Sequence, residues 1–462
     1  MPARKVETWI SSDMEDKKLE RRLGLFPATN IVVANMIGAG VFTTAGLLMA
    51  GLGDPVLMLS LWLIGGIIAL CGAMSYGELG AAMPGAGGEY LFLSRLFGPM
   101  AGFLSGWVSF IVGFSAPIAA SAMGFSEYLF KAFPGFMSVA GSGDAVTSLW
   151  TGKAISVGVI LIFTLIHYRG IKTGAAVQNI LTIVKVGVIV VLIVAGFASG
   201  AGEVSHFTVS DNSVTGFPGL KTVGLSLMWI MFAYSGWNAA TYIGSELKNP
   251  LRTLPGSLLW GTLIVTVLYL GVNALFVYAI HPEQMKGVIA VGGLATVQLF
   301  GQSAGTLFSL MIAFALFSSL SAFIIIGPRV YYSMASDGLF FKAVSKVHPR
   351  FHVPANAILL QSLIAIIFVL SGTFDQILTY LGFSLGIFPL LAVIGVFRQR
   401  RRNPEAPRLP GYPVTQIIYL SAGLLIMVLS FLERPAESSV ALLTVLAGVP
   451  AYYLFKRASS LK

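Results

Sequence analysis

The sequence predicts an all-α, polytopic membrane protein, and three observations support that fold class. The chain of 462 residues is 56% hydrophobic and only 10% charged, so it lacks the polar surface of a soluble globule. Its apolar residues form long runs, and its basic residues are concentrated in alternate gaps between those runs. Because about 20 apolar residues in a helix cross a bilayer core of about 30 Å, each long run predicts one span.

Twelve such runs lie between charged or Pro/Gly-rich breaks, so we expect 12 transmembrane helices. They lie near residues 26–50, 55–83, 98–130, 153–169, 176–198, 219–245, 256–281, 292–335, 355–372, 374–396, 412–431 and 436–457. The third and eighth runs are too long to lie in lipid throughout, so we expect them to extend beyond the hydrocarbon. No segment predicts a separate soluble domain.

The distribution of basic residues predicts the orientation. If the N-terminus is cytoplasmic, the inner segments hold 23 Lys and Arg residues and the outer segments hold five. This asymmetry follows the positive-inside rule and places both termini in the cytoplasm. The cluster RQRRR at 398–402 is then first a topology anchor, with an anionic-lipid site as the alternative. The net charge of +10 therefore does not indicate a nucleic-acid partner.

The termini and the single cysteine exclude several further classes. Residues 1–24 are polar and lack the apolar core of a secretory signal, so we expect a cytoplasmic tail there and a second one at 458–462. Cys71 lies in an apolar run and excludes an internal disulfide. The histidines show no metal-ligand spacing, and we expect neither a metal nor a cofactor.

Lys185 is the one basic residue that falls well inside a span, in VQNILTIVKVGVIVVL. A lysine at that depth costs about 2.5 to 3.5 kcal/mol on insertion scales. It could snorkel to the cytoplasmic edge. The favoured interpretation is that it faces the protein interior or a wet cavity. There its charge would take the place of a bound cation, or its side chain would lose and regain a proton while the protein works.

Two glycines interrupt the first span, in NMIGAGVF at 35–42. Gly38 and Gly40 weaken a helix and allow close approach to its backbone. A helix broken there would line a cavity with free amides and carbonyls, which suits the two charged ends of a zwitterion. Close helix packing through small residues is the alternative.

A similar interruption occurs in the sixth span, where Ser235-Gly236 and Trp237-Asn238 stand inside an apolar run. Broken first and sixth spans are what an inverted five-plus-five repeat predicts. The repeats would cover residues 25–198 and 219–396, which are close to equal in length, with two further helices at 412–457 outside them.

Four motifs carry a resemblance to a known family: NMIGAGVF, YGELGAAMPGAGGEY at 76–90, FAYSGWNAATYIGSELKNPLRTLP at 232–255 and RVYYSMASDGLFF at 329–341. Together they resemble the amino acid–polyamine–organocation superfamily, and FAYSGWN resembles its L-type amino acid transporter branch and bacterial relatives. The resemblance covers all ten core spans and implies the leucine-transporter-like fold, with helices 1 and 6 broken.

The resemblance also implies a binding site at the two breaks. The substrate carboxylate would bind the small-residue loop of the first break, and the amine would bind carbonyls of both breaks. The implied residues are Gly38, Ala39 and Gly40 for the carboxylate, and Met36, Ile37, Phe232, Ala233 and Ser235 for the amine. Many members carry Ser or Thr in place of Ala39, so one hydrogen bond to the carboxylate is expected to be missing.

Gating and coupling residues follow from the same resemblance. Phe232 would close over the substrate from outside, and Trp237 and Asn238 would shape the pocket or its gate. Lys185 matches the family's fifth-helix lysine, whose ammonium would join the first helix to the eighth near Ser318 and Ser319 and make sodium unnecessary. A lysine that loses and regains a proton in each cycle is the alternative.

The expected function is secondary active transport of neutral L-amino acids across the plasma membrane by alternating access, as sodium-independent exchange or proton-coupled symport. No carboxylate lies in the middle of the third, sixth or eighth span, which argues against cationic amino acids and polyamines. That substrate class and an amino-acid sensor without transport are the alternatives. No constellation of nucleophile, base and orienting residue indicates an enzyme.

Two carboxylates, Glu78 and Glu246, end the second and sixth spans on the cytoplasmic side. They could form ion pairs of an inner gate, or they could be ordinary helix-end carboxylates that are solvated. The basic residues in range are Arg95, Arg169, Lys248 and Arg252.

A further expectation concerns partner chains. The resemblance implies that human members of the L-type branch work with a single-span glycoprotein, linked by a disulfide to a cysteine between the third and fourth helices. This sequence has no cysteine there, so we expect no disulfide-linked heavy chain. The short tails indicate a bacterial inner membrane, with lipid as the only other partner besides the substrate.

Overall fold

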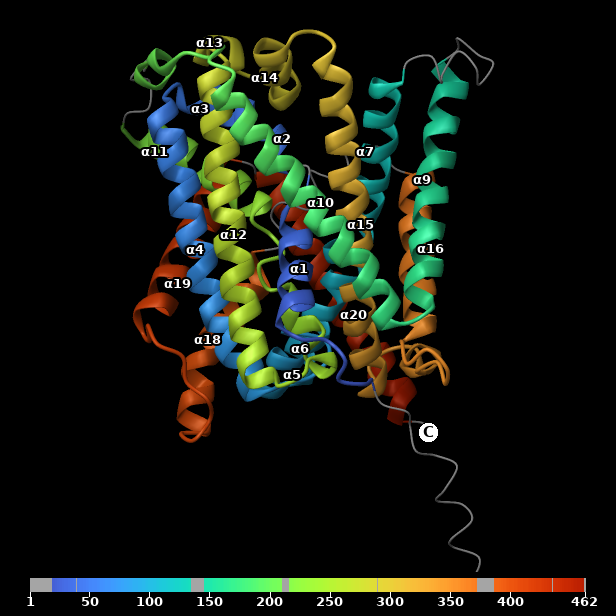
Figure 1. The fold of residues 1–462 in the computed structure, drawn as a ribbon. Coiled ribbons are helices and arrows are strands. Elements are labelled where there is room, and N and C mark those ends of the chain that lie inside the picture. Colours follow the sequence, from blue (N-terminus) through green and yellow to red (C-terminus); the bar gives the residue numbers. More distant parts are fainter. Residues whose placement is uncertain are drawn as a thin grey trace, which may run out of the picture.

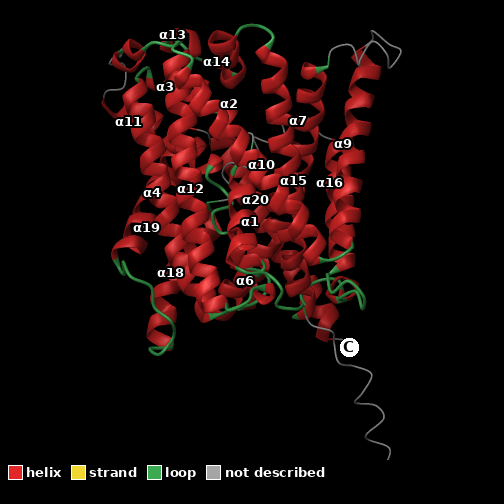
Figure 2. Ribbon diagram, viewed as in Figure 1, coloured by secondary structure: helices red, strands yellow, loops and turns green. Residues whose placement is uncertain are grey.

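The computed structural model describes residues 19–38, 40–133, 145–209, 216–288, 290–371, 386–433 and 435–460. Within these ranges helices joined by loops and turns make up the fold (Figures 1 and 2). The helices are α1 Leu25–Met36, α2 Gly40–Thr43, α3 Ala45–Leu52, α4 Pro55–Ala82, α5 Glu89–Phe97, α6 Pro99–Val108, η1 Ser109–Ser115, α7 Ala116–Ala132, α9 Ala145–Tyr168, α10 Ile171–Ala198, η2 Val204–Thr208, α11 Gly216–Ala233, η3 Ala239–Tyr242, η4 Gly244–Glu246, α12 Pro250–Ala279, α13 Pro282–Met285, α14 Val291–Phe300, α15 Ala304–Ser336, η5 Lys342–Ser345, α16 Ala355–Ser371, α18 Ile387–Arg402, α19 Val414–Glu433 and α20 Pro435–Ser460.

Nine helical segments of the described chain are long and apolar enough to cross a membrane. They confirm an all-helical, polytopic membrane protein. The segments are Leu25–Thr43, Pro55–Ala82, Pro99–Ala132, Leu149–Tyr168, Ile171–Ala198, Pro250–Ala279, Ala304–Ser336, Val414–Glu433 and Ser438–Ala458. Two further predicted spans are present as shorter apolar helices, Gly219–Ala233 and Ala355–Ser371. The predicted span at 374–396 stays a prediction, because residues 372–385 lie outside the described ranges.

The long third and eighth runs differ from one another in the structure. The third is continuous from Pro99 to Ala132, with a π-helical segment, η1, in its middle. The eighth is not one helix, because the polar turn at 301–303 separates α14 from α15. Of the run at 292–335, only α15 is therefore long enough to span the membrane.

Both predicted interruptions are present. Helix α1 ends at Met36 and α2 begins at Gly40, while α11 ends at Ala233 and the chain runs through a turn to η3 at Ala239. We call residues 37–39 the first break and residues 234–238 the second break. Ala39 itself lies outside the described residues.

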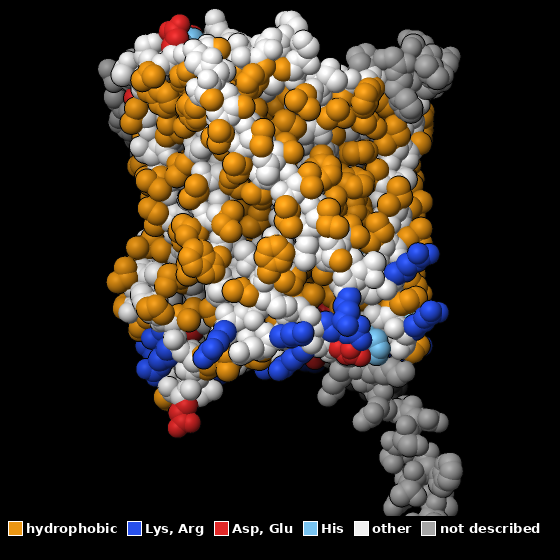
Figure 3. Space-filling view, viewed as in Figure 1, with side chains coloured by type: hydrophobic (Ala, Val, Ile, Leu, Met, Phe, Trp, Pro, Cys, Tyr) orange, Lys and Arg blue, Asp and Glu red, His pale blue; other side chains and the backbone are white. Residues whose placement is uncertain are grey.

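The outer surface matches a membrane environment (Figure 3). Hydrophobic side chains cover the middle of the visible face, and Lys and Arg side chains gather at one end. We call this the basic end. Helix α5 lies at the same end (Figure 1), where Arg402 donates to the Arg95 carbonyl at 3.3 Å.

Helix α12 packs closely along α1 through Gly261. A Cβ at Gly261 would lie 2.7 Å from Cβ of Val32, which is fully buried. The backbone of α12 therefore approaches α1 only because no side chain intervenes.

We expect Gly261→Ala to lower the melting temperature of the purified protein in detergent, because overpacking a tight contact costs about 1 to 3 kcal/mol. Gly187→Ala is the matched control: Gly187 is exposed in the middle of α10, and a Cβ there would have no neighbouring atom within 4 Å. That control should leave stability unchanged or raise it by about 1 kcal/mol, since Ala favours helix over Gly. Equal melting temperatures for the two variants would contradict close packing at Gly261.

Candidate functional site

The two breaks lie directly against each other. Gly236 has φ of +97°, and a Cβ there would lie 2.9 Å from the carbonyl carbon of Asn35 in α1. A Cβ on Gly40 would lie 3.0 Å from Cα of Ala233. The second break therefore needs glycine at 236 both for its left-handed backbone and for its contact with α1.

Tyr269 of α12 joins the two helix ends that precede the breaks. Its hydroxyl lies 2.6 Å from the carbonyl oxygen of Met36 and 2.9 Å from that of Ala233. These are orphan carbonyls of α1 and α11, which a helix end must satisfy in some other way. Tyr269 is not among the residues predicted from the sequence, because one tyrosine in an apolar helix gives no signal of what it faces.

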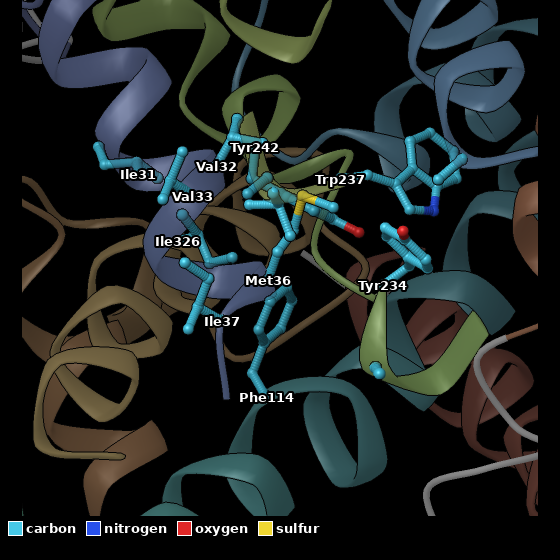
Figure 4. Close-up of a cluster of buried hydrophobic side chains, with 14 of the residues drawn as sticks. Ile31, Val32, Val33, Met36, Ile37, Phe114, Tyr234, Trp237, Tyr242 and Ile326 are labelled. Carbon is cyan, nitrogen blue, oxygen red and sulfur yellow. The ribbon is translucent and has the colours of Figure 1, made fainter. Parts of the chain in front are cut away.

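A central cavity of about 220 Å³ lies between the breaks. Eight of the predicted site residues line it, together with hydroxyls from α6, η1 and α7 that are not among those predicted residues. The predicted residues are Met36, Gly38, Gly40, Phe232, Ala233, Ser235, Trp237 and Asn238; the hydroxyls belong to Ser105, Ser109 and Ser121. Figure 4 shows Met36, Phe114, Trp237 and Tyr242 in one cluster of buried side chains from α1, η1 and the region of the second break.

Lys185 points into the protein and not toward the membrane edge. It is 1% exposed, and its ammonium donates to the carbonyls of Ala34 at 3.3 Å and Ile37 at 2.9 Å and to Oγ of Ser319 at 3.0 Å. An ammonium has three donors, and each has an acceptor here. The snorkelling interpretation of Lys185 is therefore wrong.

Ser318 and Ser319 take different parts in this arrangement. Ser319 Oγ donates to the Ile37 carbonyl at 2.7 Å, alongside Lys185. Ser318 instead accepts from Nε2 of Gln178 at 3.3 Å. Because Lys185 and Ser319 together use both acceptor positions of the Ile37 carbonyl, that oxygen is occupied by the protein itself.

Trp237 is buried between α4 and α19. Its ring centroid lies 4.8 Å from that of Tyr76 and 5.6 Å from that of Tyr419, in edge-to-face geometry. Gly72 of α4 leaves room for it, since a Cβ there would lie 2.8 Å from the indole. Phe232 is half-buried and borders the cavity.

Asn238 of the second break contacts Glu89, which belongs to the motif at 76–90 but has no predicted role. Asn238 Nδ2 donates to Oε1 of Glu89 at 2.6 Å. Glu89 is the first residue of α5, borders the cavity and is 5% exposed. It lies outside the nine membrane-spanning segments. Burial raises its pKa to about 7, against the opposing effect of the nearby Tyr76 hydroxyl and of the hydrogen bonds from Tyr242 and Asn238.

The carboxylates at the basic end have other partners than the sequence suggested. Glu246 pairs with Arg329 of α15, at 2.8 Å and 3.1 Å, and both side chains are buried. Glu78 pairs with Arg400 of α18, at 2.6 Å and 2.7 Å. The expectation of solvated helix-end carboxylates is thus wrong for both residues, and their pairs lie across helices.

Within the described part of the chain, no group of three or more His, Cys, Asp or Glu side chains could hold a metal ion. The site instead offers backbone amides, carbonyls and hydroxyls around a cavity between two interrupted helices. A polytopic helical protein with that arrangement belongs to the class of secondary transporters, which bind small solutes at unwound helices.

Comparison with known proteins identifies the family. The family model "Amino acid permease" matches residues 23–450, and the chain belongs to that family, within the amino acid–polyamine–organocation superfamily. It is 30% identical to the serine/threonine exchanger SteT of Bacillus subtilis, over 96% of this chain and 98% of the relative.

Two mammalian relatives are also similar over most of the chain. It is 27% identical to the human cystine/glutamate transporter, covering 96% and 86% of the two chains. It is 26% identical to the mouse large neutral amino acids transporter small subunit 2, covering 94% and 81%. The protein is therefore a multi-pass amino acid transporter and not an enzyme.

We expect Tyr269→Phe to reduce transport by about tenfold while the protein still inserts in the membrane. Two buried helix-end carbonyls would lose their shared donor, and an unsatisfied buried group costs about 1 to 3 kcal/mol. The measurement is the initial rate of labelled amino acid uptake into proteoliposomes. Tyr453→Phe, on an exposed position of α20, is the control, and equal rates for both variants would refute the role of the Tyr269 hydroxyl.

Proposed function

We propose that this protein transports neutral L-amino acids by alternating access, binding the charged ends of the substrate at the two breaks. The observation that carries the proposal is the cavity bordered by both breaks, where backbone amides and carbonyls lack the partners of a continuous helix. An amino acid brings a carboxylate and an ammonium, which are the complements of those groups.

The carboxylate is proposed to bind at Gly38, Ala39 and Gly40, and the amine at carbonyls of Met36, Phe232, Ala233 and Ser235. Ile37 is proposed to contribute through Lys185, because two donors already use both acceptor positions of its carbonyl. The Met36 and Ala233 carbonyls share the single proton of the Tyr269 hydroxyl, so each keeps an acceptor position for the amine. Phe232, Trp237 and Asn238 are proposed to gate the site. Phe232 suits this role because it is only half-buried where it meets the cavity.

Neutral substrates are favoured by the hydroxyl and apolar lining from α6, η1 and α7. Cationic amino acids are the second candidate, and Glu89 is the observation that favours them, since it places a carboxylate at the cavity. Its hydrogen bonds from Asn238 and Tyr242 already engage that carboxylate, which is why neutral substrates remain the first proposal.

Exchange is the proposed mode, with Lys185 as a fixed cation; proton symport with a titrating Lys185 is the alternative. The name of one relative, a serine/threonine exchanger, supports exchange. The three acceptors around the Lys185 ammonium support a fixed charge, because they satisfy every donor of the charged form.

The proposed architecture has 12 spans in the leucine-transporter-like fold. Residues 25–198 and 219–396 form the two repeats, 412–457 the last two helices, and 1–24 and 458–462 the cytoplasmic tails of a plasma-membrane protein, in a bacterial inner membrane. Breaks in the first helix of each repeat support this arrangement. The basic end is proposed to face the cytoplasm.

We further propose that the protein works without a disulfide-linked partner. Its single cysteine, Cys71, is 6% exposed within α4. A thiol enclosed in this way does not reach a partner chain outside the membrane.

The test is uptake of labelled L-serine, L-leucine or L-arginine into proteoliposomes that are empty or preloaded with unlabelled amino acids, with and without an inward proton gradient. We expect uptake of a neutral substrate into preloaded vesicles only. Uptake into empty vesicles driven by protons would replace exchange with symport. Binding without uptake under any condition would indicate a sensor, and uptake of L-arginine alone would establish the cationic candidate.

We expect Lys185→Ala to lower exchange more than tenfold, because the Ile37 carbonyl and its neighbours would lose the charge that holds the first break. Lys172→Ala is the control, since Lys172 is exposed on the same helix, α10. Both variants are first checked for membrane insertion by surface expression. Normal uptake by an inserted Lys185→Ala protein would refute the coupling role.

A further inference from the structure

The loop between α4 and α5 is attached to the chain that follows the second break. The amide of Gly87 donates to the Tyr242 carbonyl at 3.1 Å, and Ala86 forms an isolated antiparallel bridge with Ile243. Gly88 has φ of +52°, and a Cβ there would lie 2.7 Å from the Tyr242 ring. This backbone contact presents Glu89, the next residue, to the second break.

Glu89 differs from the other buried carboxylates at this end of the molecule. Glu78 and Glu246 each pair with an arginine. Glu89 has no Lys, Arg or His partner among the described residues, and its Oε1 accepts only from Asn238 at 2.6 Å and Tyr242 at 3.4 Å. A buried carboxylate without a cation is costly when ionised, so its protonation is easily changed by its surroundings.

We propose that Glu89 is a proton-dependent positioning residue. Its ionised carboxylate holds Asn238, and with it the second break, against α5 at the basic end of the cavity, and uptake of a proton by that carboxylate releases the hold. This inference rests on the transport function proposed above. It assigns to the second break a latch that is separate from the Lys185 site on the first break.

The chemistry of the Asn238 contact supports this role. A hydrogen bond to an ionised acceptor is roughly twice as strong as one between neutral groups. A proton bound to the carboxyl turns the charge-assisted bond into a neutral one, so the hold on Asn238 weakens without any covalent change. The raised pKa of about 7 for Glu89 places this change near neutral pH, with the ionised, holding form above it and the protonated form below.

The titratable groups that face Glu89 do not compete for this proton. They are the phenols of Tyr76 on α4, Tyr242 on η3 and Tyr419 on α19, and a phenol ordinarily titrates near pH 10. Arg329, the charged residue of α15, pairs with Glu246. The charged side chains of α18 that contact α5, and that of Asp337, which follows α15, engage other residues of α5 or its backbone. Asp337 accepts from Tyr90, Arg398 lies over Phe97, and Arg402 donates to Arg95.

The experiment compares wild type, Glu89→Gln, Glu89→Asp and Asn238→Ala for exchange in proteoliposomes at the same pH on both sides. Glu405→Gln is the matched control, because Glu405 is an exposed carboxylate in the loop that follows α18. Between about pH 8 and about pH 6 the protonated fraction of a carboxyl that titrates near 7 rises about tenfold. We expect the wild-type and Glu405→Gln rates to rise severalfold over that range.

Glu89→Gln should be fast and independent of pH, because the amide resembles the protonated carboxyl. Asn238→Ala should also lose the pH dependence, and Glu89→Asp should retain it. A wild-type rate that does not change with pH, or a Glu89→Gln profile that parallels wild type, would overturn the latch. So would arginine uptake that Glu89→Gln abolishes, because Glu89 would then be a side-chain site for a cationic substrate.

A second readout separates failure of the latch from failure of the transport proposal. A cysteine is placed in the cavity by Ser109→Cys in a Cys71→Ser background, and a membrane-impermeant maleimide is added from the basic end. The labelling rate is divided by that of a small free thiol at the same pH, because only the thiolate reacts with the maleimide. This ratio should increase as the pH falls through 7 and should lose its pH dependence when Glu89→Gln is added. If the labelling ratio depends on pH but no exchange is measured, the transport proposal is rejected and the latch is retained. If the ratio has the same pH dependence with Glu89 and with Glu89→Gln, the latch is rejected.

Discussion

A helix that is broken inside a membrane must find partners for the backbone groups it leaves open, and that constraint organises this protein. The carbonyl of Ile37 accepts from Lys185 and Ser319, and those of Met36 and Ala233 share the one proton of the Tyr269 hydroxyl. In lipid no water would satisfy them. The surrounding helices α10, α12 and α15 therefore do more than enclose a cavity, because each contributes a polar group that keeps a break open.

Two kinds of buried charge result, and they lie in different places. The ammonium of Lys185 stands behind the first break, among carbonyl and hydroxyl oxygens. The buried carboxylates lie toward the basic end, where two have an arginine and the third, Glu89, has Asn238 and Tyr242. The first break is thus supported by a positive group and the second by a negative one, each making its contact across a long separation in sequence.

The sequence was informative where a residue is unusual for its surroundings. Gly38, Gly40 and Ser235-Gly236 stand out in apolar runs, and a lysine at position 185 is conspicuous in a membrane helix, so the breaks and the buried charge could be predicted. Tyr269, Glu89 and the pairing of Glu78 with Arg400 could not. Tyrosine is ordinary in such a helix, Glu89 begins a short helix at a loop, and the choice of Arg400 over nearer basic residues depends on how α18 packs beside α4.

The contact between Gly236 and Asn35 has a consequence for leakage. A methyl group at position 236 would clash with the carbonyl carbon of Asn35, and the Tyr269 hydroxyl contacts the last carbonyls of both α1 and α11. Neither broken helix therefore has room to shift alone. Helices α1 and α11 are then expected to move as one body. A protein that changes shape in one concerted step spends little time in half-open forms, and such forms are the ones that would let water and ions follow the substrate through the membrane.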